Sequence, residues 1–195
     1  NVLVGTDGVP LKETDKVIGN MMPKWTGSIG NTVTWRDFSL TALVDVLYGG
    51  DFISMTDAYA TTAGNSKRSL SGRDGMVFDG IVESTGQKNT TSVKAEAFYN
   101  SIGGSSAVAE EFMYKRTYIK MGELALGWTL PKKWLSQTPL KAVKLSLVAR
   151  NLFYFYKKAP VSAESSFSRE DYAQAFEYAS LPPTRAIGFS LNVKF

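Results

Sequence analysis

The sequence predicts an all-β fold in which antiparallel strands form part of the wall of a large transmembrane β-barrel. Three observations lead to this prediction. Several segments alternate between apolar and polar residues, the connections between them are either very short or very long, and aromatic residues gather at the segment ends. A barrel strand crosses a bilayer with about 9–11 residues that face lipid and lumen in turn, so alternation over such lengths is expected of it.

The last nine residues give the clearest alternation in the chain, because apolar and polar or small residues follow one another without a break. One face of this strand carries only apolar side chains, and its last residue is aromatic. We interpret the segment as the strand that closes the barrel, where an aromatic terminus beside the carboxylate fits the end of an apolar band. Its apolar residues are Ile187, Phe189, Leu191, Val193 and Phe195.

Four further strands are expected at about residues 25–35, 38–49, 117–130 and 142–152. They are rich in β-branched and aromatic residues, as strands usually are. The first two are joined by Arg36 and Asp37, which form a tight hairpin turn. In the fourth strand, Lys144 and Arg150 share the polar face, and we expect that face to point inward because a basic side chain is costly against lipid.

The connections between the expected strands differ sharply in length. Residues 36–37 and 131–141 are short links, whereas residues 50–116 and 153–185 are long, and the two kinds alternate along the chain. If the last strand ends at the periplasm, both long loops lie outside the cell, as outer-membrane barrels require. Five strands cannot close such a barrel, and lipid does not tolerate an open edge. The chain is therefore either part of a larger wall or not a membrane protein.

Aromatic residues at the expected strand ends are candidates for the rings of aromatic side chains that barrels place at the membrane surface. The alternative is that they belong to a core or to a sheet edge. The candidates are Trp25, Trp35, Tyr48, Tyr118, Trp128 and Phe153.

Composition excludes several classes of function. The 195 residues include no cysteine and no histidine, which rules out disulfides, zinc sites built on those residues and a catalytic triad that uses histidine. The net charge is +4, but the basic residues are scattered, so we do not expect nucleic-acid binding. No pair of carboxylates has recognisable glycosidase spacing. We expect no cofactor, no metal and no enzymatic activity.

Several motifs resemble SusC/RagA-type TonB-dependent outer-membrane transporters. They occur in the family's order and span nearly the whole chain. Two departures occur: Gly122 stands where the family often has arginine, and residues 162–164 replace its usual Asp-Pro-Glu. The motifs are I-G-N-M-M-P-K-W at Ile18–Trp25, Y-G-G-D-F at Tyr48–Phe52, E-L-A-L-G-W-T-L-P at Glu123–Pro131, V-A-R-N-L-F at Val148–Phe153, and the ending Phe176–Phe195.

The resemblance implies a barrel of about 22 strands with an N-terminal plug. Residues 1–195 would form its C-terminal segment and supply the last five strands and two long extracellular loops, without the plug or the N-terminal strands. The implied function is TonB-dependent import of a bulky nutrient, typically a glycan oligomer and sometimes a peptide, across the outer membrane of a Gram-negative bacterium. The implied partners are a SusD-like surface lipoprotein, outer-membrane lipid, and TonB through the absent N-terminal region.

Aromatic residues of the long loops are candidates to stack on sugar rings or to contact the lipoprotein lid. Loop acids such as Asp74, Asp79, Glu110 and Glu111 are candidates to bond hydroxyl groups. The alternative is that these residues only pack the loops. The aromatic candidates are Tyr59, Phe78, Phe98, Tyr99, Phe112 and Tyr114.

The competing prediction is a soluble β-rich module that binds carbohydrate or acts as an adhesin. Its strands would also alternate, and it would fold alone. Such a module has no need of outward apolar faces, a terminal Phe195 or loop lengths sorted by side.

Overall fold

The computed structural model describes residues 2–168 and 170–195 of the chain. These residues form two compact units. The sheet unit comprises residues 22–50, 116–163 and 181–195, and the loop unit comprises residues 2–21, 51–115, 164–168 and 170–180.

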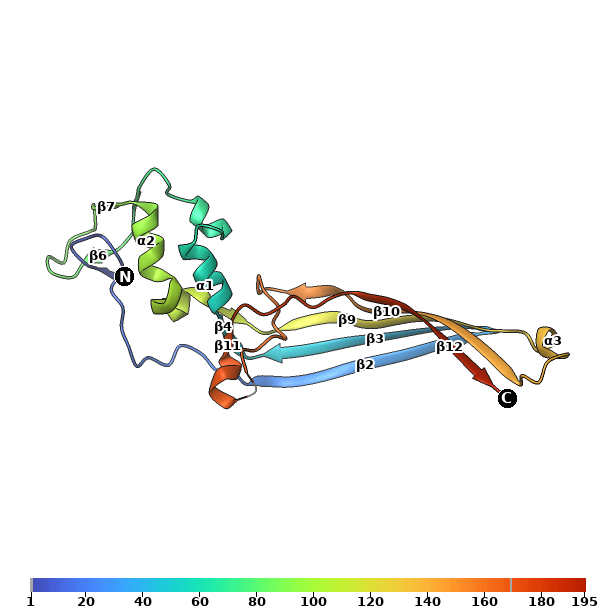
Figure 1. Cartoon of the computed structure of the whole chain (residues 1–195). Coiled ribbons are helices and arrows are strands. Elements are labelled where there is room, and N and C mark those ends of the chain that lie inside the picture. Colours follow the sequence, from blue (N-terminus) through green and yellow to red (C-terminus); the bar gives the residue numbers. More distant parts are fainter. Residues whose placement is uncertain (1, 169) are drawn as a thin grey trace. The chain divides into compact units, whose positions relative to one another are not determined.

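The sheet unit is built on one five-stranded antiparallel sheet (Figure 1). Its strands lie in the order β12-β10-β9-β3-β2, so each strand pairs with its predecessor and successor among these five along the chain. This is the up-and-down arrangement of a barrel wall. The strands are β2 (Pro23–Trp35), β3 (Phe38–Gly49), β9 (Tyr118–Thr129), β10 (Ala142–Lys157) and β12 (Ala186–Lys194).

Two short connections lie at one end of this sheet. Trp35 pairs with Phe38, so only two residues turn the chain between β2 and β3, and Arg36 takes a positive φ of 53° there. Hairpin turns of two residues need such left-handed positions. The link from β9 to β10 contains the short helix α3 (Lys132–Leu135), which begins directly after Pro131. Because the strands are antiparallel, both long connections leave from the opposite end.

The loop unit combines short strands and short helices. Its strands form a three-stranded sheet in the order β11-β4-β8 and two pairs, β1-β6 and β5-β7. The strands are β1 (Leu3–Val4), β4 (Asp51–Ser54), β5 (Met76–Val77), β6 (Ile81–Val82), β7 (Ser92–Val93), β8 (Met113–Lys115) and β11 (Phe176–Glu177). The helices are α1 (Met55–Thr62) and α2 (Ala95–Ile102), with 3₁₀ turns η1 (Lys67–Leu70), η2 (Gly104–Ser106), η3 (Ala109–Phe112) and η4 (Asp171–Ala175).

The core of the loop unit forms around α2. Phe98, Tyr99 and Ile102 are buried together with Val93, because residues three and four positions apart share one face of a helix. Gly103 follows α2 where the backbone passes close to α1, and a Cβ at this position would lie 2.8 Å from the carbonyl oxygen of Ala58. Only glycine fits this approach without a shift of the backbone.

The strand predictions are confirmed to within one or two residues at most ends, and β10 extends five residues beyond the expected Leu152. The expectation of an all-β fold needs correction. The long connections fold into α1, α2 and several small sheets, so the fold is mostly β rather than all-β. The sequence of residues 169–178 is compatible with a helical turn, and η4 lies within this range; Arg169 is outside the described residues. Among the described residues, no helix is long and apolar enough to cross a membrane.

Candidate functional site

One face of the sheet is apolar across all five strands. The ladder register places Phe189, Leu147, Leu126, Leu40 and Val33 side by side in a single row. In the described residues nothing covers this row: each of these side chains is at least 44% exposed, and Phe189 is 85% exposed. Soluble monomers rarely expose a contiguous apolar patch of this extent, whereas a barrel wall presents one to lipid.

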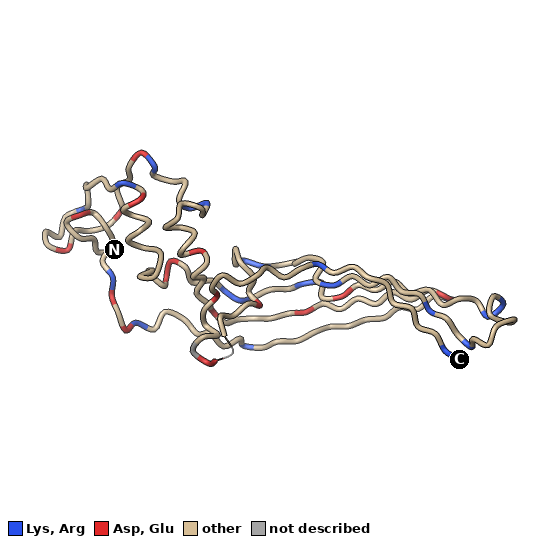
Figure 2. Tube along the Cα trace, in the orientation of Figure 1, with Lys and Arg blue, Asp and Glu red and all other residues tan. Residues whose placement is uncertain are grey.

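The opposite face is polar. The neighbouring row consists of Ser190, Ser146, Gly127, Ser39 and Thr34, again with one residue from each strand. Charged residues are sparse along the strands (Figure 2). Every charged residue of β9 and β10 that has a ladder partner lies on this polar face. The two faces therefore require two different environments.

The basic residues of β10 follow the same division. Lys144 and Arg150 are in register with the serine row and lie on the polar face, as the sequence predicted. Arg150 is paired with Glu123 of β9, with Nε 2.9 Å from Oε2. An ion pair of this kind suits a wet face and would be costly against lipid.

A bulge in β9 alters the alternation at Gly122. Glu123 pairs with Leu43 and Met121 with Val44, so Gly122 is an extra residue relative to β3. The carboxylate of Asp45 lies over Gly122, where an added Cβ would be 2.2 Å from Oδ2. Asp45 Oδ1 also accepts a hydrogen bond from Ser28 Oγ at 2.8 Å. The absence of a Cβ at Gly122 leaves room for this carboxylate.

Five of the six aromatic residues predicted for the membrane surface lie on the apolar face. At one end of the sheet, the rings of Trp25 and Tyr48 are 6.1 Å apart; at the other, Phe38 and Trp128 stack at 6.3 Å. Trp35 is in register with Phe38. Phe153 pairs with Met121, also on the apolar face. Their role at a membrane surface stays a prediction.

Tyr118 is the exception and corrects the prediction. Simple alternation places it on the face of Leu124, but the bulge at Gly122 reverses the parity of the preceding residues. Tyr118 therefore pairs with Leu47 on the polar face, is only 9% exposed, and packs edge-on against Tyr154 at 5.9 Å.

A buried carboxylate organises part of the loop unit. Glu177 is 1% exposed, and its oxygens accept hydrogen bonds from Ser54 Oγ and Thr56 Oγ1, both at 2.7 Å. The backbone N–H of Ser180 donates a third bond at 3.2 Å. Ser54 also caps α1 by accepting from the N–H of Asp57. Glu177 thus joins β11 to the start of α1, and all its observed donors are neutral.

Beside this junction is an aromatic pocket, which we define by Met55, Tyr59, Phe167, Phe176 and Tyr178. The ring of Tyr178 packs edge-on against Tyr59 at 5.5 Å and against Phe167 at 6.0 Å. The pocket has a volume of about 330 Å³. Its lining is apolar apart from the two tyrosine hydroxyls, which suits a flat ring or an apolar side chain.

A charged cluster ties α1 to β8 and η1. Tyr114 donates a 2.6 Å hydrogen bond to Asp57 Oδ2, and Arg68 donates to the Tyr114 oxygen at 3.2 Å. Arg68 also pairs with Glu111 and lies over the ring of Phe112 at 4.8 Å. Burial, with the hydrogen bond to Asp57 adding to it, raises the pKa of Tyr114 from 10.0 to about 12. The cluster holds elements together and leaves the Tyr114 hydroxyl engaged.

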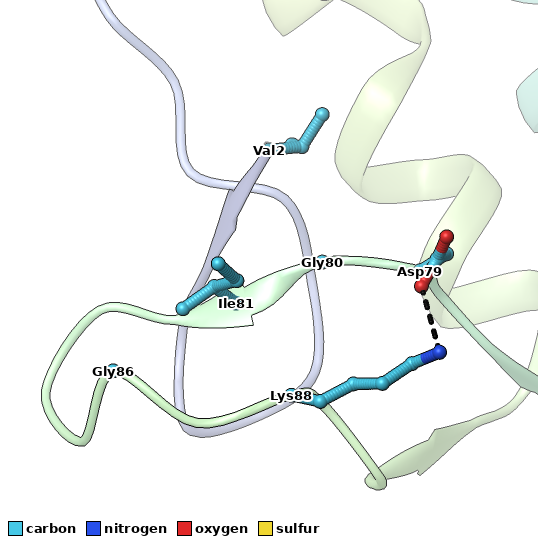
Figure 3. Close-up of a pocket in the computed structure, with 6 residues that line it drawn as sticks. All are labelled: Val2, Asp79, Gly80, Ile81, Gly86 and Lys88. Carbon is cyan, nitrogen blue, oxygen red and sulfur yellow. Dashed lines mark ion pairs between the residues drawn. The ribbon is translucent and has the colours of Figure 1, made fainter.

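A second pocket of the loop unit is polar (Figure 3) and has a volume of about 290 Å³. Asp79 Oδ1 and Lys88 Nζ lie 3.3 Å apart beside Gly80, and both side chains are largely exposed, so the pair contributes little to stability. No group of three potential metal ligands occurs among the residues that the structure describes. We therefore assign no chemistry to this pocket.

The structure separates five of the six predicted loop aromatics into two groups, and the sixth, Tyr114, belongs to the charged cluster. Phe98, Tyr99 and Phe112 are at most 7% exposed and form the interior of the loop unit, so the prediction of ligand or lid contact does not extend to them. Tyr59 is 39% exposed and lines the aromatic pocket, and Phe78 is half-buried against Phe98.

Sequence reasoning missed the partners of Tyr59. Phe167 and Tyr178 lie more than 100 residues away along the chain, and no local pattern links them to α1. The one available signal is the F-E-Y segment at Phe176–Tyr178, which sets a buried glutamate between two aromatic residues of the pocket.

The sheet is antiparallel and up-and-down, with one apolar face and one polar face. This class of structure is found in transmembrane barrel walls. No protein-family model matches the chain. A curated relative, the TonB-dependent receptor P3 of Formosa agariphila, is 22% identical over 187 residues, which cover 92% of this chain and 17% of the relative.

Two solved structures of the RagAB peptide importer share the fold. The "open-open" state has a TM-score of 0.64 and 16% identity and covers 100% of this chain and 20% of that chain. The "closed-closed" state has a TM-score of 0.60 and 16% identity, and the match covers 96% of this chain and 20% of that chain. The chain thus spans about a fifth of the proteins it matches.

Together these findings confirm the resemblance to SusC/RagA-type TonB-dependent transporters, and the mostly β antiparallel sheet is similar to their barrel-type fold. The relatives are receptors and transporters rather than enzymes, in agreement with the prediction that this chain is not an enzyme.

Proposed function

We propose that this chain forms the C-terminal wall segment and two extracellular loops of an outer-membrane transporter that imports a bulky nutrient with energy supplied through TonB. The observation that carries the proposal is the row of five exposed apolar side chains that crosses the sheet between Phe189 and Val33. The neighbouring row, on the opposite face, consists of serine, glycine and threonine. Lipid on one side and a wet lumen on the other would satisfy both rows.

In this proposal the wall is completed by strands that pair with the free edges of β2 and β12. The barrel contains about 22 strands and a plug, as in the family that the chain resembles. Residues 1–195 contribute neither the plug nor the segment that contacts TonB. The protein is located in the outer membrane of a Gram-negative bacterium.

The imported nutrient is a glycan oligomer or a peptide, and a SusD-like lipoprotein captures it over the loops. The relatives in the solved structures are named as a peptide importer, which supports the peptide alternative. The aromatic pocket supports contact with either class, because its rings of Tyr59 and Tyr178 offer flat faces to a sugar or to an apolar side chain.

Uptake of labelled nutrient by whole cells tests the proposal. Cells that carry the full-length protein are supplied with labelled peptide mixtures and labelled glycan oligomers, with and without functional TonB. We expect accumulation of one class only when TonB and the protein are both present. Equal accumulation in cells that lack either component would contradict the proposal.

Contact at the aromatic pocket is tested with the same uptake measurement. Replacing Tyr59 and Tyr178 by alanine removes both flat faces and should reduce uptake several-fold, or weaken co-purification of the lipoprotein. Leu70→Ala serves as the matched control, because Leu70 is 63% exposed in the same unit and lies outside the pocket. Equal effects of the double variant and the control would argue against a contact role.

A further inference from the structure

A third pocket lies in the sheet unit, where β12 separates from β10. Pairing between these strands ends at Arg150 and Ala186, while β10 continues to Lys157 and residues 181–185 run alongside without ladder pairing. The pocket has a volume of about 390 Å³. The residues that line it are Lys120, Asn151, Leu152, Phe153, Tyr154, Pro183 and Arg185.

Asn151 holds the two sides of this pocket together. It occupies a bulge of β10 with a positive φ of 52°, a conformation that asparagine tolerates better than most residues. Its Oδ1 accepts a hydrogen bond from Lys120 Nζ at 3.3 Å, and its Nδ2 donates to the carbonyl oxygen of Thr184 at 3.4 Å. One amide therefore positions both the lysine of β9 and the segment that carries Arg185.

The backbone before Arg185 is also constrained. Pro182 and Pro183 precede it, and each proline ring fixes φ near −65°. Together with the bond from Asn151 to Thr184, this constrains the backbone from which the Arg185 side chain extends. The pocket is thus built by specific residues rather than by a loose loop.

The charge around the pocket is predominantly positive. Lys120 and Arg185 line it, and none of the described lining residues is acidic. Two carboxylates on the polar face of the sheet have partners outside the pocket: Glu123 pairs with Arg150, and Asp45 accepts a hydrogen bond from Ser28. Asp45 lies opposite Lys120 in the ladder and balances part of the positive charge of Lys120. Arg185 therefore supplies the excess positive charge of the pocket.

We propose that this pocket binds a carboxylate group of the imported nutrient, either an acidic sugar or a peptide terminus. A guanidinium presents two parallel N–H donors that match a carboxylate, and the ring of Tyr154 provides an apolar wall beside it. Lys120 and Tyr154 are in register with the polar face, along which a transported solute would pass, and Phe153 adds a residue of the apolar face to the lining. This inference rests on the proposed transport function.

The test is equilibrium binding of citrate to the purified full-length protein in detergent, measured by calorimetry at low ionic strength. Arg185→Gln removes the two parallel N–H donors of the guanidinium and changes only an exposed side chain. It should weaken citrate binding about tenfold, as expected for loss of a charge-assisted pair. Arg185→Lys keeps the positive charge but lacks the paired N–H donors, and should give an intermediate loss of citrate affinity. Lys120→Gln should also weaken binding.

Lys144→Gln is the matched control, since Lys144 is an exposed cation on the same face of β10 and outside the pocket. Absence of citrate binding by the unaltered protein, or an equal loss in the control, would overturn the proposal. Inorganic phosphate bound more tightly than citrate would overturn the carboxylate assignment. Binding needs no TonB, so these results are independent of the uptake experiment that tests the transport function.

Discussion

At the scale of single residues, Glu177 joins two segments of the loop unit that lie more than 100 residues apart in the chain. Glu177→Ala should destabilise this unit by about 1–3 kcal/mol, since Ser54, Thr56 and the N–H of Ser180 lose their acceptor in a buried position. Hydrogen exchange of the full-length protein in detergent measures this, with faster exchange expected in β4, α1 and β11.

The matched control for this prediction is Glu83→Ala, which removes an exposed carboxylate of the same unit. Thr56→Val removes one donor and should show a smaller effect than Glu177→Ala. If exchange in α1 and β11 is unchanged in Glu177→Ala, the glutamate does not hold these elements together.

Tyr114 gives a prediction on pH dependence. Its pKa is raised in the folded state, so the neutral phenol is favoured by folding; the stabilisation is complete below pH 10 and is lost as the pH rises through about 12. Tyr114→Phe should remove a component with a midpoint near 12 from the tyrosinate absorbance titration, while circular dichroism monitors the fold. A missing component centred near 10 would show that Tyr114 is not buried beside Asp57.

At the scale of secondary structure, the bulge of β9 depends on the fit between Gly122 and Asp45. Gly122→Ala should cost about 1–3 kcal/mol, because the methyl group would overlap the carboxylate of Asp45. Asp45→Ala alone should cost less, since it removes the bond from Ser28. In the double variant the overlap is absent, so the two costs should not add.

Urea-induced unfolding of the full-length protein in vesicles provides the four free energies of this cycle. Gly30→Ala is a suitable comparison, because Gly30 lies in β2 with only the end of the Leu43 side chain near, at 3.5 Å. Additive costs for Gly122→Ala and Asp45→Ala would contradict the packing described here.

The same bulge separates the features that could be predicted from the sequence from those that could not. Alternation predicted all five strands and the face of residues such as Leu126 and Phe189, because side chains of a regular strand must alternate. Nothing local marked Gly122 as an extra residue, so Tyr118 was expected on the wrong face. The aromatic pocket was out of reach for another reason: Tyr59 and Tyr178 meet only through tertiary folding.

At the scale of the whole molecule, the two faces of the sheet should respond differently to charge. Phe189 lies near the middle of β12 on the apolar face, and Ser190 follows it on the polar face. If the apolar face meets lipid, Phe189→Arg should destabilise the barrel by about 2–4 kcal/mol, and Ser190→Arg should have little effect. Urea titration in vesicles measures both variants, and equal costs would contradict lipid contact.

The exposed apolar row and the two unpaired edges also determine how this chain behaves alone. In the described residues, β2 and β12 each pair on one side only. The five apolar side chains of the row that crosses the sheet between Val33 and Phe189 are open to solvent. Unpaired edges and a large apolar patch both favour association between copies. We therefore expect residues 1–195, expressed alone, to aggregate in buffer and to be recovered only in detergent or together with upstream sequence. Size-exclusion chromatography with light scattering measures this, and a monodisperse monomer in plain buffer would instead favour the soluble β-rich binding module.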